Sequence, residues 1–127
     1  SFYNQSFIAK LNLADELGTE FASSLTAAAI KVARLSPQAS CLVCYEGANR
    51  KWFNRSPGFP KEFWPIRELH PESDAFSMTF QPARGISKVK RSSGNRWLEG
   101  RGVDRLEVES QSARIANEVV LTMLRLS

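Results

Sequence analysis

The chain has 127 residues, of which 43% are hydrophobic and 24% are charged, so it can form one compact domain with a core. No apolar run approaches the roughly 20 residues that a transmembrane helix needs, and no secretory signal opens the chain, so we expect a cytoplasmic protein that does not enter a membrane. The net charge of +4 is uneven. Residues 84–105 hold seven basic and two acidic side chains, and the remainder of the chain sums to −1. Such a segment can attract polyanions or serve as a solvated loop.

The opening third of the chain has the apolar spacing of helices. Apolar residues recur three and four positions apart over residues 11–21 and again over residues 25–35, which predicts two helices. Ser24 is placed to cap the second helix, and Pro37 ends it. Two helices joined by a turn at residues 22–24 have the skeleton of a helix-turn-helix.

A hairpin follows from residue 39. The run Cys41–Tyr45 is rich in apolar and β-forming residues, Glu46–Asn49 has turn chemistry, and Lys51–Arg55 returns as the second strand.

The two cysteines of this hairpin form a C-x-x-C pair. A zinc site needs four converging ligands, and the sequence offers only these cysteines and a single histidine, His70. Side chains three apart on a strand also point to opposite faces, so Cys41 and Cys44 cannot share one ion. We therefore predict two apolar, buried thiols without a metal, a mutual disulfide or a cofactor.

The second half of the chain reads as strands closed by a helix. Phe76, Met78 and Phe80 alternate as one face of a strand, and further strands are expected around Trp97 and from residue 105 to 109. Residues 115–124 have apolar side chains at helical spacing, which predicts an amphipathic C-terminal helix.

No catalytic motif is present in this sequence. It lacks G-x-S-x-G, a phosphate-binding glycine loop and H-E-x-x-H, so we do not expect this chain to be an enzyme by itself. DNA binding is an open alternative. Its candidate residues are Lys31, Arg34, Lys88, Lys90 and Arg91, but acidic side chains on the first predicted helix would repel phosphate.

Several stretches resemble a known family. L-x-x-E-F-A-S-S-L-T-A-A-A-I from Leu17 to Ile30, then C-L-V-C-Y-E-G from Cys41 and K-W-F-x-x-S from Lys51, are similar to the region downstream of the peptidase domain in ImmA/IrrE-type proteins. The end also resembles that family, with L-E-V-E-S from Leu106 and V-L-T-M-L from Val120. The family's H-E-x-x-H and acidic zinc ligand are absent, so no metal-binding role is transferred to any residue here.

The resemblance implies a fold and a function. The implied fold is α+β, with a helix-turn-helix-like segment at residues 1–36 and a GAF-like antiparallel sheet with a C-terminal helix at residues 37–127. Because the chain begins at Ser1, we expect it to be the regulatory or sensory part of a longer protein. Its expected partners are a small-molecule signal, a repressor-type protein, or a second copy bound through the C-terminal helix. The expected pocket or core aromatics are Trp52, Phe53, Phe76 and Phe80.

Overall fold

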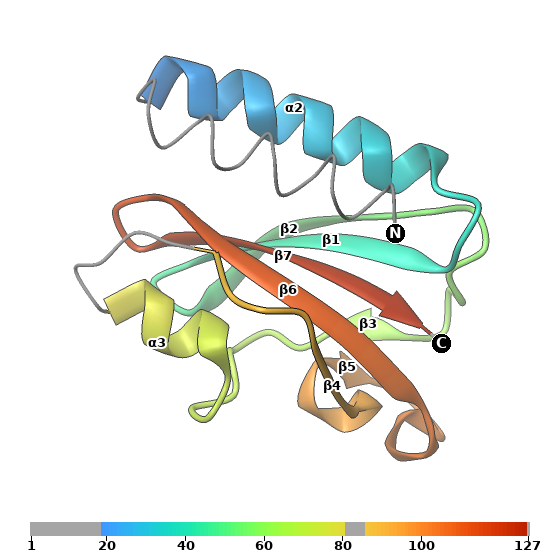
Figure 1. Cartoon of the computed structure of the whole chain (residues 1–127). Helices are drawn as coiled ribbons and strands as arrows, with labels where there is room; N and C mark the ends of the chain where they lie inside the picture. The colour runs from blue at the N-terminus through green and yellow to red at the C-terminus, as the bar shows by residue number, and fades with distance from the viewer. Residues whose placement is uncertain (1–18, 81–85, 127) are drawn as a thin grey trace.

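The computed structural model describes residues 19–80 and 86–126, and the burial of side chains from residue 26 onward. A five-stranded antiparallel sheet in the order β2-β1-β7-β6-β4 forms the centre, with α2 across one face and α3 and a two-stranded sheet on the other (Figure 1). The elements are α2 (Thr19–Leu35), β1 (Ser40–Glu46), β2 (Asn49–Arg55), β3 (Trp64–Pro65), α3 (Asp74–Phe80), β4 (Lys90–Ser93), η1 (Gly94–Arg96), β5 (Leu98–Glu99), η2 (Val103–Arg105), β6 (Glu107–Ala116) and β7 (Val119–Leu126).

Each face of the large sheet has its own core. Under α2, Ala29 and Ala33 pack on Leu42 and Leu121, and their small side chains let the helix approach the strands closely. The opposite core contains larger side chains, including Tyr45, Phe59, Phe63, Trp97 and Leu98. Burying one large apolar side chain contributes about 1.5–3 kcal/mol, so the aromatic core holds the irregular segments against the sheet.

The predicted hairpin is confirmed. β1 and β2 pair antiparallel, with Val43 opposite Phe53, and Gly47 and Ala48 form the two-residue turn. β1 is buried from Ser40 to Tyr45 because it lies inside the sheet, between β2 and β7, with a core on each face.

The predicted fold class is wrong at both ends of the chain. The described residues form mostly antiparallel sheet with two short helices, rather than an α+β domain preceded by a helical pair. α2 runs unbroken through residues 22–24, where a turn was predicted, because serine is tolerated within an alanine-rich helix. Most of the first predicted helix, residues 11–21, lies outside the described residues. Among those described, no helix has the length and apolar character needed to cross a membrane.

The predicted C-terminal helix, residues 115–124, is instead the end of β6, a tight turn and the first part of β7. β7 lies between β1 and β6, and residues 120–124 are all buried. A strand covered on both faces is apolar at successive positions, and this run happens to match helical spacing as well. Dimerisation through a C-terminal helix is therefore overturned, because this segment is an inner strand of the sheet.

The predicted strand at residues 76–80 is a helix. Ser73 Oγ accepts a hydrogen bond from the Phe76 amide at 3.1 Å and so caps the first turn of α3. Phe76 and Phe80 are four residues apart, and their ring centroids lie 5.0 Å from each other. This local cap outweighs the alternating pattern of three apolar residues.

Candidate functional site

An open cleft of about 680 Å³ lies at the tip of the β1–β2 hairpin. Three segments that are distant in sequence form its walls: the hairpin turn, residues 66–71, and the region from η1 to β5. Phe76 of α3 adds an aromatic side chain. The lining residues are Gly47, Ala48, Asn49, Ile66, Arg67, Glu68, Leu69, His70, Pro71, Phe76, Asn95, Arg96 and Glu99.

Backbone hydrogen bonds fix the first two walls. The Arg50 amide donates to the Arg67 carbonyl at 2.7 Å, and the Leu69 amide donates to the Ala48 carbonyl at 2.9 Å. Gly47 and Ala48 have φ angles of 56° and 70°, which is the left-handed backbone that a tight hairpin turn requires. This conformation is sterically unfavourable for Ala48, so contacts with the surrounding residues must stabilise the turn.

His70 is anchored at the edge of the cleft. Its Nδ1 accepts a hydrogen bond from the Glu72 amide at 3.1 Å, so the neutral ring carries its proton on Nε2. The His70 carbonyl accepts from the Ser73 hydroxyl at 2.8 Å, which links the histidine to the cap of α3. The ring is thus positioned by a backbone amide two residues further along the chain and presents an N–H donor.

The cleft carries both signs of charge. Arg67 and Arg96 supply guanidinium groups, and Glu68 and Glu99 supply carboxylates. Arg96 also approaches Glu72, with 3.6 Å between Nη2 and Oε2. A ligand with separated positive and negative groups and an apolar part would complement these walls.

The four aromatics predicted as pocket or core residues do not form one pocket. Trp52 packs in the core under α2, whereas its neighbour Phe53 lies on the opposite face of the sheet, because successive strand residues alternate. Phe76 lines the cleft, but Phe80 is 55% exposed and does not contribute to it. The structure therefore brings only one of the four to the candidate site.

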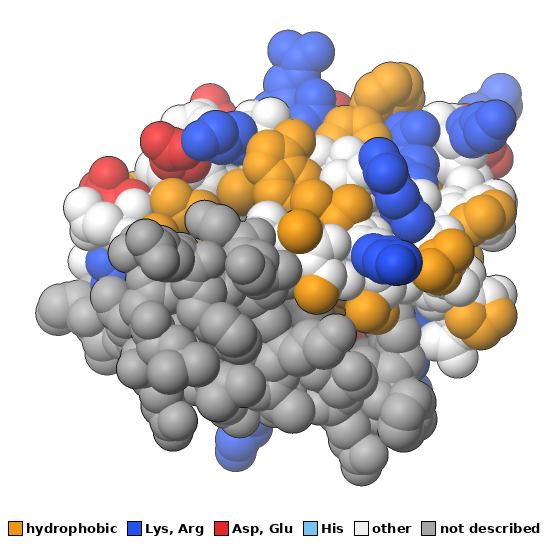
Figure 2. Space-filling view, turned by 90° about the horizontal axis from the view of Figure 1, so that it is seen from above, with side chains coloured by type: hydrophobic (Ala, Val, Ile, Leu, Met, Phe, Trp, Pro, Cys, Tyr) orange, Lys and Arg blue, Asp and Glu red, His pale blue; other side chains and the backbone are white. Residues whose placement is uncertain are grey.

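The predicted DNA-contacting residues fall on different elements. Lys31 and Arg34 belong to α2, and Arg34 Nε donates to Asn54 at 3.0 Å. Lys88 is exposed before β4, and Lys90 forms an ion pair with Asp74 at 3.0 Å. Figure 2 views the α2 side, where the described Lys and Arg side chains alternate with apolar, acidic and uncharged ones.

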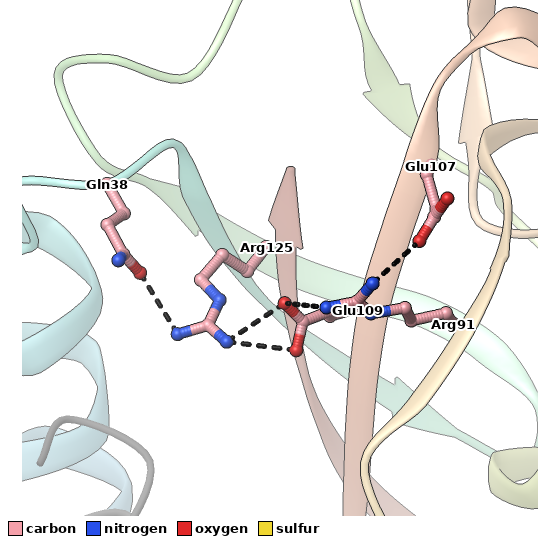
Figure 3. A network of polar contacts seen from close by, with 5 residues as sticks. All are labelled: Gln38, Arg91, Glu107, Glu109 and Arg125. Carbon is pink, nitrogen blue, oxygen red and sulfur yellow. Dashed lines mark hydrogen bonds and ion pairs between the residues drawn. The ribbon is translucent and has the colours of Figure 1, made fainter. Parts of the chain in front are cut away.

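Arg91 belongs to a mixed-charge network on the α2 side of the sheet (Figure 3). It donates to Glu107 at 3.3 Å and lies 4.0 Å from Glu109. Arg125 donates to both carboxylate oxygens of Glu109, at 3.0 and 2.9 Å, and to Gln38 at 3.0 Å. Two carboxylates from β6 therefore lie beside the Arg91 side chain of β4, and they lower the attraction of Arg91 for phosphate.

The two thiols are separated by the sheet, as strand periodicity predicts. Cys41 lies in the aromatic core, and Cys44 lies under α2. Burial raises the pKa of Cys41 to about 12 and that of Cys44 to about 11, so both stay protonated at neutral pH. Within residues 19–80 and 86–126, no group of three or more His, Cys, Asp or Glu side chains could hold a metal ion.

Sequence reasoning missed most of the cleft. The turn at residues 46–49 is predicted from the sequence, but that pattern does not show that residues 66–71 and η1 meet the hairpin. The signal in the sequence that points to part of the cleft is the turn at Gly47, which polar side chains follow. The tertiary contacts that assemble the cleft leave no periodic pattern in the sequence.

Comparisons with known proteins do not identify a family. No protein-family model matches the chain, and no curated protein matches it significantly. The resemblance to ImmA/IrrE-type proteins consequently rests on sequence motifs, and function is argued from the cleft and its neighbouring surfaces.

Proposed function

We propose that this chain is a non-catalytic regulatory module that senses a small zwitterionic ligand in the cleft, as part of an ImmA/IrrE-like protein. The observation that carries the proposal is the cleft itself, which combines two arginines, two glutamates and Phe76 around about 680 Å³. Binding sites for small molecules commonly have volumes on the order of 300–1,000 Å³ and combine apolar walls with a few polar groups. An amino acid or a dipeptide has the matching chemistry.

The non-catalytic part of the proposal is supported by the state of the nucleophiles. Both thiols are buried and have raised pKa values, which disfavours the reactive thiolate. The Nδ1 of His70 is engaged by a backbone amide. Buried free thiols also suit the reducing cytoplasm, where we place the module.

The peptidase question has a direct test. The purified chain, supplied with zinc and a repressor-type protein, should leave that protein intact. Specific cleavage that a chelator abolishes would contradict the non-catalytic proposal.

Ligand binding is tested with a panel of free amino acids and dipeptides in thermal unfolding assays. A ligand at 100 times its Kd stabilises the folded state by about 2.7 kcal/mol, which is readily detected. The same amino acids and dipeptides with an acetylated amino group and an amidated carboxyl group should not stabilise the chain, since they lack both terminal charges.

Variants locate the binding site. Glu99→Gln and Phe76→Leu should weaken binding of any stabilising compound, whereas Arg101→Gln, an exposed position outside the cleft lining, should not. The proposed ligand class is wrong if no member of the panel stabilises the chain. The proposed site is wrong if a stabilising compound binds both cleft variants unchanged.

A further inference from the structure

Within the described part of the chain, β2 presents an unpaired sheet edge beside an exposed tryptophan. β2 is the outermost strand of the large sheet at one end, and its register determines which backbone groups face outward. The Ser56 amide donates to the Ser40 carbonyl at 2.8 Å, so residues 54 and 52, two and four positions earlier, also face β1. The amides and carbonyls of Phe53 and Arg55 therefore point away from the sheet.

These outward groups have no backbone partner among the described residues. The Arg50 amide is already paired with the Arg67 carbonyl, and the register then shifts at a bulge opposite Cys44 and Tyr45. Beyond that bulge, no described segment pairs with the edge from Trp52 to Arg55, which is therefore available to a further strand. An added strand would complete the hydrogen bonds of this edge.

The side chains of the same residues build an aromatic and cationic platform. The Arg55 guanidinium lies 4.9 Å from the Phe53 ring centroid and 4.6 Å from that of Trp64, and the two rings meet edge to face at 5.8 Å. Arg50 lies 5.1 Å from the Phe53 centroid. Cation–π contacts and the hydrogen bond that Arg55 donates to the Phe63 carbonyl hold the platform in place, yet Trp64 is 49% exposed.

The positive charge of β2 favours an acidic binding partner. β2 carries Arg50, Lys51 and Arg55 and no acidic residue, and Arg55 Nε is buried without a hydrogen-bond partner in the described part of the chain. The exposed pair between Lys51 and Glu46, at 2.7 Å, offsets this charge only weakly. The other outer strand, β4, begins with Lys90 and Arg91, so pairing with a second copy of β2 or β4 would oppose like charges.

We propose that the edge of β2, together with the Trp64 platform, docks an extended acidic segment of a protein partner by strand addition. Backbone pairing at Phe53 and Arg55 would supply affinity without sequence preference. Carboxylates near Lys51 and Arg55, and an apolar side chain on Trp64, would supply selectivity. This inference does not depend on a ligand in the cleft, because the two surfaces use different residues.

The test uses a synthetic probe. An acetylated and amidated eight-residue peptide in which Glu alternates with Val or Tyr is added to the isotope-labelled chain, and amide exchange is followed by NMR. Binding should slow exchange at Phe53 and Arg55 and shift the indole N–H signal of Trp64. A peptide with Lys in place of Glu, and an acidic peptide with N-methylated central amides, should each bind weaker by about tenfold or more.

Matched variants separate the platform from general surface effects. Trp64→Ala and Lys51→Ala should weaken binding of the acidic peptide, while Phe80→Ala and Arg101→Ala, which remove an exposed aromatic and an exposed cation elsewhere, should not. Thermal unfolding of each variant checks that it is folded, and the N-methylated peptide tests strand addition without any change to the protein.

Three results would overturn the inference. In the first, the acidic, basic and N-methylated peptides bind equally. In the second, the shifts centre on Arg67 and His70 in the cleft. In the third, an oligothymidine perturbs Trp64 at lower concentrations than the peptide does, which would make the platform a surface for single-stranded nucleic acid.

Discussion

Replacing Gly94 by alanine should destabilise the fold strongly, because an added methyl group would meet backbone. A Cβ at this position would lie 2.2 Å from the Val103 carbonyl oxygen, and the Cβ atoms of real residues essentially never come closer than 3.0 Å to another heavy atom of this kind. Gly94 cannot easily withdraw, since its amide donates to Leu106 at 2.8 Å and its carbonyl accepts from Trp97 at 3.1 Å. η1 and η2 must therefore separate.

The magnitude follows from what that separation disrupts. The Val103 carbonyl accepts the Leu106 amide at 3.1 Å, and loss of such a bond costs about 0.5–1.5 kcal/mol. Overpacking of a buried site adds about 1–3 kcal/mol. We expect a loss of about 3 kcal/mol in the free energy of unfolding, which lowers Tm by about 10 °C for a domain of this size.

Two other glycines provide controls in the same assay, thermal and urea unfolding followed by circular dichroism. A Cβ at Gly58 or Gly102 would meet nothing within 4 Å, but Gly102 has a φ of +82°. Gly58→Ala should be neutral or slightly stabilising, and Gly102→Ala should cost about 1–2 kcal/mol through backbone strain alone. If Gly94→Ala were as stable as the unmodified chain, the packing of η1 on η2 described above would be wrong.

Three further predictions concern the thiols, a turn and the basic strand. The free energy of unfolding should fall as the pH rises above 9, by up to about 1.4 kcal/mol per pH unit for each thiol. The reason is that the thiols ionise near pH 9.0 in the unfolded chain, whereas burial in the folded chain raises the pKa of Cys41 to about 12 and that of Cys44 to about 11. Urea titrations should show a flatter pH profile for the double alanine variant, and an unchanged slope would argue against the effect. Glu118→Gly should raise the free energy of unfolding by about 0.5–1 kcal/mol, since this exposed residue has a φ of +57°; equal or lower stability in urea would count against it. Duplex DNA should bind weakly and without sequence preference, fading at about 150 mM salt, because Lys90 and Arg91 pair with carboxylates; tight, sequence-specific binding in an anisotropy titration would refute this.

Local chemistry in the sequence was sufficient for the hairpin and for the separation of the thiols. A glycine turn between two β-forming runs predicts β1 and β2, and the two-residue period of a strand places Cys41 and Cys44 on opposite faces. Both inferences depend on neighbours along the chain, so they need no knowledge of the remaining fold. The same period also separates Trp52 from Phe53, so these two of the four aromatics predicted as pocket or core residues pack against different cores.

Only the tertiary structure decided the rest. Residues 115–124 satisfy helical spacing, yet β7 is a strand because β1 and β6 pair with it and cores cover both its faces. The cleft depends on contacts between the hairpin turn, residues 66–71 and η1, which are separated along the chain by β2, β3, α3 and β4. Periodicity indicates which face of an element is apolar, but it does not indicate which distant segment will cover that face. The conformation of such a segment is decided by the free energy of this tertiary packing, which overrides local propensity.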